Sequence, residues 1–346
     1  MDKAQKKALL QTEIQHVDIT KINATPVIDA MRGMSFASRE TARATDIFVK
    51  MVNDADCSNI LTLAGSTSAG GCMQAYVDLV RHNMIDAVVS TGASVVDMDF
   101  FEALGYKHYQ GSPFEDDKRL RSLYIDRIYD TYIDEEELQN CDATVKEIAD
   151  SIEPRPYSSR EFIAEMGKWL AVHSKKKDSL IQVCYEKGVP IFVPAFSDCS
   201  AGFGLVLHQK ERIQQGKPYV TIDSVADFRE LTDIKIAANV TGLLMIGGGS
   251  PKNFAQDTVV CAECQGIDVP LHKYAVQITV ADVRDGACSS STLKEASSWG
   301  KVDTIWEQMV YAEATTVLPL LASYAYHNAQ WQLRKSRNFN QIFVKK

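Results

Sequence analysis

The sequence lacks any apolar run long enough to cross a membrane. No stretch of its 346 residues approaches the ~18 uninterrupted apolar residues that a spanning helix needs. The first residues, MDKAQKKALLQTEIQH, also lack the apolar core of a secretory signal. We therefore expect a cytoplasmic protein that has no membrane partner.

An excess of basic residues is also missing. The chain has 37 Lys and Arg against 45 Asp and Glu, which gives a formal net charge of -8 and a pI near 5.5. A nucleic-acid surface needs clustered Lys and Arg, so this balance argues against nucleic acid as a partner. A small cationic substrate suits an acidic protein better, because opposite charge attracts it.

Cysteine is sparse, and its eight residues are scattered along the chain. This pattern indicates reduced thiols, since disulfide frameworks are dense and belong to small secreted domains. Cys261 and Cys264 form one C-x-x-C and His272 follows, so a metal or redox site competes with ordinary packed thiols. A structural zinc needs four ligands, and no second C-x-x-C or H-x-x-x-H completes the set. We expect no metal.

Short apolar runs alternate with stretches of helical spacing. Predicted strands cover residues 60–64, 87–90, 191–194, 242–246 and 274–278. Predicted helices follow the first, second and fourth strands, at residues 74–82, 100–103 and 254–264. This alternation predicts a doubly wound α/β fold, a mostly parallel sheet of Rossmann-like type covered on both faces.

A charged stretch interrupts this alternation at about residues 115–160. It contains the acidic run at 134–137 and ends near a proline-rich segment at 153–156. Charge runs usually face water, so we favour a solvated helical insertion over an acidic binding arm. We expect residues 1–20 to form an N-terminal helical arm and residues 21–346 to form a single domain that carries the insertion.

Three loops rich in Gly and Ser follow predicted strands, at residues 64–71, 90–94 and 247–250. Ligands of open α/β sheets bind at the carboxyl ends of strands, where such loops let backbone amides approach phosphate. None of the loops matches G-x-G-x-x-G, and tight packing turns are the alternative explanation. Asp97, Asp99 and Asp198 are available to accept hydrogen bonds from ribose hydroxyls.

The segment EASSWGK, residues 295–301, is the most distinctive part of the chain. Glu295 and Trp299 share a helix face, and Gly300 marks the expected helix end that frees Lys301. A carboxylate beside an indole face can bind an alkylammonium ion, and a desolvated lysine can act as a nucleophile. A solvated helix terminus with a favourably placed lysine is the alternative.

Four motifs resemble those of the deoxyhypusine synthase family. They are RHNMIDAVVSTGA at 81–93, VPIFVPAFSD at 189–198, GGGSPK at 247–252 and EASSWGK at 295–301. The similarity runs in family order from about residue 55 to residue 325, which is most of the chain.

The resemblance implies an enzyme that uses NAD to dehydrogenate an amine, typically spermidine, and forms an imine on Lys301. The aminobutyl group then passes to an acceptor, which is a translation-factor lysine or, in homospermidine-forming relatives, putrescine. Family members are homotetramers with sites at a subunit interface. The matching cofactor positions are Gly65, Ser66, Thr91, Gly92, Ala93, Asp97, Asp198, Gly248, Glu313 and Ala314.

The substrate positions depart from the family pattern. They comprise Glu295, Trp299, Asn253, Asp285, Gly286, Cys288 and Phe203. Phe203 and Cys288 stand where the family has aspartates, and Asn253 stands where it has a histidine. Burying an unpaired ammonium is costly, so these changes predict a shorter, less charged or differently held amine.

Three functions remain open on the sequence. The leading hypothesis is an NAD-dependent aminoalkyl transferase that acts on a polyamine or related amine. An NAD-dependent amine dehydrogenase or transferase on a non-polyamine substrate is the second. A non-catalytic homologue is the third, and it predicts that Lys301 lies too far from the nicotinamide to share an imine carbon.

Overall fold

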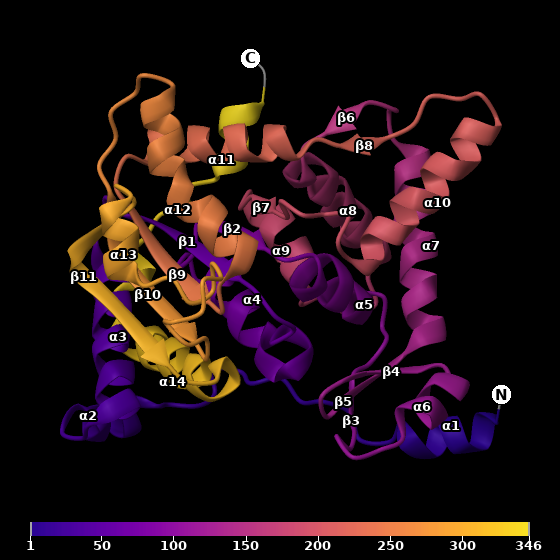
Figure 1. Cartoon of the computed structure of the whole chain (residues 1–346), viewed down its shortest axis with the longest axis horizontal. Helices are drawn as coiled ribbons and strands as arrows, with labels where there is room; N and C mark the ends of the chain where they lie inside the picture. Colours follow the sequence, from indigo (N-terminus) through magenta and orange to yellow (C-terminus); the bar gives the residue numbers. More distant parts are fainter. Residues whose placement is uncertain (1, 345–346) are drawn as a thin grey trace.

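The computed structural model describes residues 2–344. They form one six-stranded sheet with helices packed around it (Figure 1). Its strand order is β11-β10-β9-β1-β2-β7, and all neighbouring strands are parallel. The chain forms the central strand β1 first and adds β2 and β7 on one side. It then crosses back and adds β9, β10 and β11 on the other side. This order confirms the predicted doubly wound fold. The strands are β1 (Ser58–Leu63), β2 (Ala87–Ser90), β7 (Ile191–Phe192), β9 (Thr241–Ile246), β10 (His272–Thr279) and β11 (Val302–Tyr311).

The two central strands show why an apolar run forms a strand here. Every residue of β1 and β9 is buried, as expected for parallel strands covered on both faces. All five predicted runs belong to this sheet. The sixth strand, β11, was not predicted, because its sequence VDTIWEQMVY mixes polar and apolar residues. It is an edge strand whose middle residues face solvent, so it carries no continuous apolar signal.

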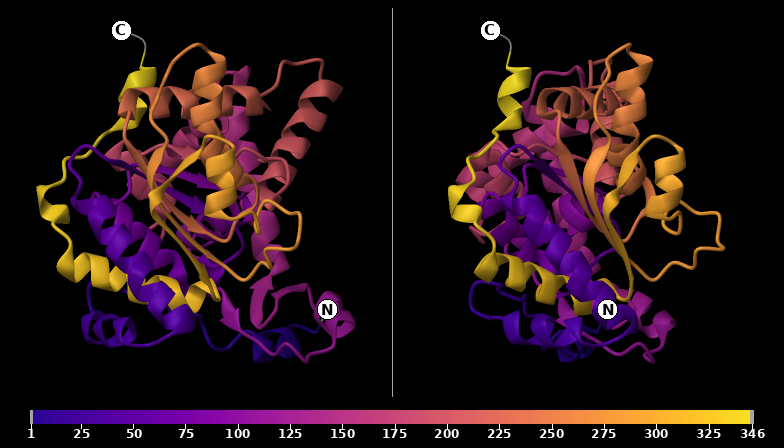
Figure 2. Two further views of the ribbon diagram at one scale, coloured as in Figure 1. Left: turned by 60° about the vertical axis from the view of Figure 1, so that its left-hand side comes forward. Right: turned by 90° about the vertical axis from the view of Figure 1, so that its left-hand side faces the viewer.

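Helices cover both faces of the sheet (Figure 2). Successive strand residues point to opposite sides, so Leu61 packs in the core below α3, α4 and α14, whereas Ile60 packs in the second core below α11 and α12. The first layer comprises α3 (Phe36–Asn53), α4 (Met73–Arg81) and α14 (Ala314–Asn328); the second comprises α11 (Ser224–Ala238), α12 (Gly249–Cys264) and α13 (Leu293–Ser298). Five further helices are α2 (Thr25–Arg32), α5 (Met98–Ala103), α8 (Ser159–His173), α9 (Leu180–Lys187) and α10 (Ser200–Gln214).

The charged stretch and the N-terminal arm pack together beside the main sheet. Lys6 of α1 (Lys3–Leu9) pairs with Asp134 at 2.7 Å and with Glu136 at 2.9 Å. The stretch contains helices, as expected, and also an antiparallel hairpin that its charges did not reveal. Its elements are α6 (Asp117–Ser122), β4 (Ile125–Ile128), β5 (Thr131–Asp134), α7 (Glu135–Ser151) and β6 (Pro156–Tyr157), while β3 (Tyr109–Gln110) pairs with β5 and β8 (Thr221–Ile222) pairs with β6. The division of the chain into an arm and one domain stays a prediction.

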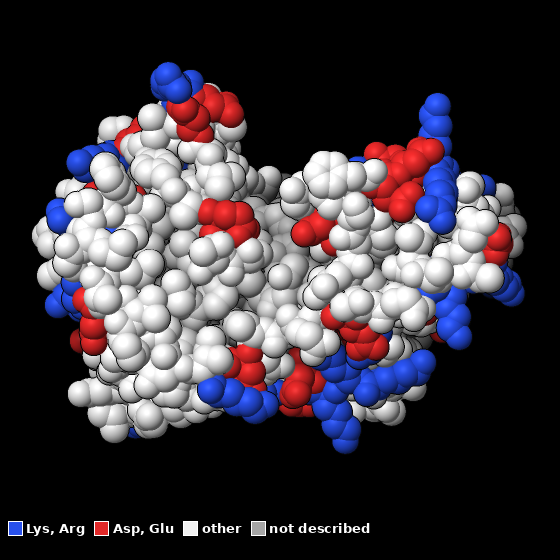
Figure 3. All heavy atoms as spheres, turned by 90° about the horizontal axis from the view of Figure 1, so that it is seen from below, with Lys and Arg blue, Asp and Glu red and all other residues white. Residues whose placement is uncertain are grey.

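On the face seen in Figure 3, Lys and Arg gather at the lower margin and at the sides, where Asp and Glu lie beside them. The middle of this face is mostly uncharged, apart from a few Asp and Glu. None of the helices in the described part of the chain is both long and apolar enough to cross a membrane.

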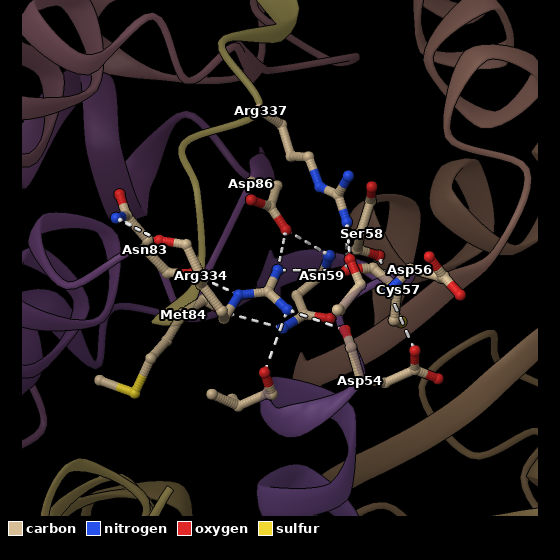
Figure 4. Close-up of polar contacts among 12 residues, drawn as sticks. Asp54, Asp56, Cys57, Ser58, Asn59, Asn83, Met84, Asp86, Arg334 and Arg337 are labelled. Carbon is tan, nitrogen blue, oxygen red and sulfur yellow. Dashed lines mark hydrogen bonds and ion pairs between the residues drawn. The ribbon is translucent and has the colours of Figure 1, made fainter. Parts of the chain in front are cut away.

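After α14 the chain runs back along the sheet and is held by one buried arginine (Figure 4). The Arg334 guanidinium pairs with Asp86 at 2.6 Å, and the two side chains are 4% and 2% exposed. It also donates to the carbonyls of Val52, Cys57 and Asn83 at 2.7–3.1 Å. Burial raises the pKa of Asp86, and the arginine opposes that shift. The C-terminal segment is thereby tied to the residues that precede β1 and β2.

We expect Arg334→Ala to lower the free energy of unfolding by about 3–5 kcal/mol, because the change leaves the Asp86 carboxylate buried without its partner. The exposed neighbour Lys335 provides the control, and Lys335→Ala should change stability little. Thermal and denaturant unfolding of both variants would measure the difference. Equal stability of the two variants would contradict a central role for the ion pair.

Candidate active site

Three glycine-rich loops meet at the carboxyl edge of the sheet. The chain reverses direction across the sheet between β1 and β9, and this switch point opens a crevice in doubly wound folds. The amide of Ala64 donates to Ile246 O at 2.9 Å, which joins the loops after these two strands. The amide of Thr91 donates to Leu63 O at 2.9 Å and brings in the loop after β2.

Two glycines in the loop after β9 allow a close approach that a side chain would prevent. Gly247 has φ +73°, and an added Cβ would lie 2.9 Å from Ala64 O. At Gly248 an added Cβ would lie 2.3 Å from the Cα of Ser289. Helix α12 begins at Gly249, whose amide donates to Ser289 Oγ at 3.1 Å, and Pro251 in its first turn has no amide hydrogen. The start of a helix favours an anion, and here Ser250 and Lys252 are the residues of the first turn that keep an amide for one.

A first cavity of about 670 Å³ opens beside the loop after β1. Ser66 and Glu313, two of the predicted cofactor residues, line one wall. The opposite wall is the β4–β5 hairpin, where Tyr129 adopts a left-handed conformation with φ 51° and Asp130 follows it. Two carboxylates and no Lys or Arg occur among its described lining residues. Such a cavity suits ribose hydroxyls, which donate to carboxylates, better than an additional phosphate.

The other predicted cofactor residues lie around this edge without lining the cavity. Asp97 is buried and accepts from the amides of Ser200 at 3.1 Å and Ala201 at 2.8 Å, so it caps α10. Asp99 similarly caps α9, and burial raises the pKa of both carboxyls. Asp198 is exposed in the turn before α10. The remaining positions, in the loops or at the start of α14, are Gly65, Thr91, Gly92, Ala93, Gly248 and Ala314.

A second cavity of about 590 Å³ lies between α12, α13 and the loop at 286–291. The first α12 residue that lines this cavity is Asn253, one helical turn after Gly249. Helix α12 therefore runs from the glycine-rich loop after β9 to the second cavity. Apolar and aromatic side chains such as Phe228 and Val260 complete its walls. Six predicted site residues line it together: Asn253, Gly286, Cys288, Glu295, Trp299 and Lys301.

The local fold of the EASSWGK segment places Lys301 inside this cavity. Helix α13 starts with a capping box, in which Thr292 Oγ1 accepts from the Glu295 amide at 3.0 Å and Glu295 Oε2 accepts from the Thr292 amide at 3.2 Å. The helix ends at Ser298, and Gly300 adopts φ 68°. Lys301 then turns back, with its side chain 13% exposed. This agrees with the helix end expected at Gly300.

The Lys301 ammonium has two partners. Its Nζ lies 2.6 Å from Asp257 Oδ1 and 5.3 Å from the centre of the Trp299 ring. The sequence analysis did not identify Asp257 as a site residue, although its spacing along the chain indicated one. Its position four residues after Asn253, on a predicted helix, places both residues on one face.

A second lysine, Lys252, is buried behind the residues that line the cavity and supports its wall. It is 1% exposed, and burial lowers its pKa to about 8. Its Nζ donates to Cys288 O and to Ser291 Oγ, each at 3.0 Å, and also to Ser291 O. The lysine of the GGGSPK motif therefore anchors the loop at 286–291, whereas Lys301 faces the cavity.

Two predicted substrate residues are not brought to this cavity. Phe203 lies on α10, which is at the other side of the molecule in Figure 1, and its side chain is 61% exposed. Asp285 is exposed in the loop before Gly286. Within one subunit neither residue contacts an amine held beside Lys301.

The thiols of the C-x-x-C sequence also line the second cavity. Cys261 and Cys264 are unpaired and sit on the α12 face that carries Asp257. Across residues 2–344, no three His, Cys, Asp or Glu residues are grouped so that they could hold a metal ion. The chemistry available here is that of a lysine, carboxylates, an indole and thiols.

Comparisons with known proteins agree with these motifs. The family model described as deoxyhypusine synthase matches residues 26–325. A deoxyhypusine synthase-like protein of Caulobacter vibrioides is 68% identical over 342 residues, which cover 99% of this chain and 93% of the relative. A probable deoxyhypusine synthase 2 of Methanosarcina mazei is 37% identical over 307 residues, which cover 88% and 87% of the two chains.

A solved structure has the same fold at lower sequence similarity. A solved structure from Entamoeba histolytica that carries the same family name superposes with a TM-score of 0.60 and 18% identity, over 93% of this chain and 99% of that chain. At this identity the likeness shows the fold alone. The family model and the relatives decide the assignment: this chain belongs to the deoxyhypusine synthase family.

Proposed function

We propose that the protein transfers an aminoalkyl group from a polyamine or related amine, in an NAD-dependent reaction that proceeds through an imine on Lys301. One observation carries the proposal. The Lys301 ammonium is held by a carboxylate and an indole face inside a cavity that α12 connects to the crevice of the sheet. Family membership supports the reaction class, and the cavity supports the lysine.

The residues around the first cavity fit a dinucleotide. Glu313 and Asp130 offer carboxylates to ribose hydroxyls. The loop at 66–70, which contributes Ser66, Thr67 and Gly70 to this cavity, would lie beside the phosphates. NAD, when bound, would accept a hydride from the amine. The protein's own contribution is to fix this group at the crevice and to align the substrate along α12.

The second cavity supplies binding and positioning. Trp299 offers its ring face to an ammonium, and Asp257 offers charge. Phe228 and Val260 exclude water from the reacting amine. Because Gly300 ends α13, Lys301 is free of the helix and can move toward a substrate carbon, as a nucleophilic lysine must.

The cavity also favours a substrate different from that of the typical family member. Cys288 and Asn253 line it where the family has ionisable groups, so fewer charges face the amine. A diamine, or an amine outside the polyamines, therefore remains a candidate donor or acceptor. Comparing several amines in one assay separates these alternatives.

We further propose a homo-oligomer, as in other family members. The α10 surface supports this assembly, because Phe203, Val206, Leu207 and Ile213 are 47–61% exposed along one helix. Burying these side chains against a second copy removes apolar surface from water.

Lys301→Arg should abolish imine formation, because guanidinium stays protonated and cannot act as the nucleophile. Borohydride trapping with NAD and a panel of amines, followed by peptide mass spectrometry, would locate the adduct on Lys301 in the unchanged protein. NAD affinity should stay within about twofold, since the charge is retained. Lys294→Arg, an exposed position on α13, is the control and should still form the adduct. An adduct reproducibly found on another lysine would disprove the assignment.

The acidic first cavity should discriminate between dinucleotides. We expect NAD to bind at least about tenfold more tightly than NADP, a difference of about 1.4 kcal/mol, because the extra phosphate would face Glu313 and Asp130. Calorimetric titration would measure both affinities. Asp130→Asn should narrow the difference, and tighter binding of NADP by the unchanged protein would refute this reading of the cavity.

The assembly can be tested on α10. Light scattering should give a mass several times that of the 38.4 kDa chain, and Val206→Asp should reduce it by placing a charge in the apolar surface. Val172→Asp, at an exposed valine on α8, should leave the mass unchanged. A monomeric parent protein would exclude an interface site.

A further inference from the structure

Asp257 is the carboxylate nearest to the reacting lysine, and none of the motifs that identify the family assigns it a role. It lies in the middle of α12, with its side chain 27% exposed toward the second cavity. In residues 2–344 its carboxylate has one ionic partner, the Lys301 ammonium at 2.6 Å. Asp257 is therefore placed to respond when the charge of that lysine changes.

Among the charged residues that line the cavity, Asp257 is the carboxylate that would lose its partner if Lys301 became neutral. The described lining residues include two carboxylates, Asp257 and Glu295, and one cation, Lys301. Glu295 Oε2 already accepts from the Thr292 amide and holds the start of α13. Asp257 has no comparable backbone bond, so it is the carboxylate available to a ligand.

The chemistry of the lysine removes the partner of Asp257 during the reaction. Once NAD has accepted a hydride from the substrate amine, Lys301 would attack the resulting imine carbon and expel the nitrogen bonded there as an amine or ammonia. Lys301 attacks as a neutral amine, so its ammonium must first give up a proton, which leaves to solvent at the cavity mouth. The Asp257 carboxylate, which is 27% exposed, then stays in a partly buried position without a counter-ion, which is unfavourable. A cation supplied by the substrate restores the pairing.

We propose that Asp257 binds the second ammonium group of a diamine or polyamine substrate and exchanges Lys301 for it. The inference rests on the proposed imine role of Lys301. The incoming ammonium takes the place of the lysine beside the carboxylate and above the Trp299 ring, so the charge of the site is conserved while Lys301 becomes a free amine. Substrate binding thereby releases the nucleophile.

The position of Asp257 also accounts for the altered substrate residues. Cys288 lines the same cavity from the loop at 286–291, where the family pattern has an aspartate. In this chain the carboxylate beside Lys301 stands on α12. A far ammonium would therefore be bound from the α12 side of the cavity.

The test compares two amines that differ by one charged group, 1,4-diaminobutane and 1-aminobutane. Each is incubated with NAD and the full-length protein, and the rate of the borohydride-trapped Lys301 adduct is measured against amine concentration. The parent protein should prefer the diamine. Asp257→Asn should raise the half-saturating diamine concentration about tenfold or more while changing the reaction with 1-aminobutane little, because it removes one charged contact.

Two further variants separate binding from folding. Asp257→Glu should recover part of the diamine preference, since it keeps the carboxylate. Glu263→Gln removes a charge from an exposed site on the same helix and should behave as the parent protein. Unfolding temperatures close to that of the parent would confirm that α12 is intact in all variants.

The outcomes distinguish this inference from the proposed function. Asp257→Asn could raise the half-saturating concentrations of both amines equally, or change neither, while adducts still form on Lys301. That result would refute the role of Asp257 and leave the proposed function standing. If the parent protein forms no Lys301 adduct with either amine or with spermidine, the proposed function fails and the inference fails with it.

Discussion

The parallel pairing of β1 with β9 is the constraint on which the candidate site depends. Six consecutive residues pair in register, from Ser58 opposite Thr241 to Leu63 opposite Ile246. Because the strands end together, the loops that follow them meet at one point, and β2 brings a third loop beside them. A shift of one residue would turn the apolar side chains of β1 to the wrong layers and separate the loops.

Helix α12 extends the effect of this pairing to the second cavity. It begins directly after the β9 loop and presents Asn253, Asp257 and Cys261 along one face. The loop after β9 and the partner of Lys301 are therefore joined by one helix. A dinucleotide at the crevice and an amine at the lysine would be aligned by the helix, since side chains on helices are positioned more precisely than those on loops.

The sequence could predict the elements whose signals are local. Buried central strands are continuous apolar runs, and the helix end at Gly300 follows from the need for a left-handed residue. The β11 strand was not predictable in this way, because its middle is exposed at the sheet edge. The β4–β5 hairpin was hidden within a charged stretch whose acids serve to cap α7 and to pair with Lys6.

Some residues of the candidate site were predicted from the sequence and others were not, because only some of their contacts are local in the chain. The lysine segment folds around its own neighbours, so a short motif was enough to place Trp299 and Lys301 together. Asp97 appeared free to bind a ligand, but its partners are amides about a hundred residues later, at the start of α10. Contacts between distant segments decide whether a carboxylate binds a ligand or caps a helix, and local patterns do not contain that information.

Lys252 has a consequence for how this protein family can change. It holds the loop at 286–291 through the main-chain oxygens of Cys288 and Ser291, together with one serine hydroxyl. Every amino acid has a carbonyl, so the wall keeps its shape whichever side chain stands at position 288. Such a scaffold can accept a different side chain at position 288 without refolding, so the lining of the second cavity can change by single substitutions while Lys301 keeps its place.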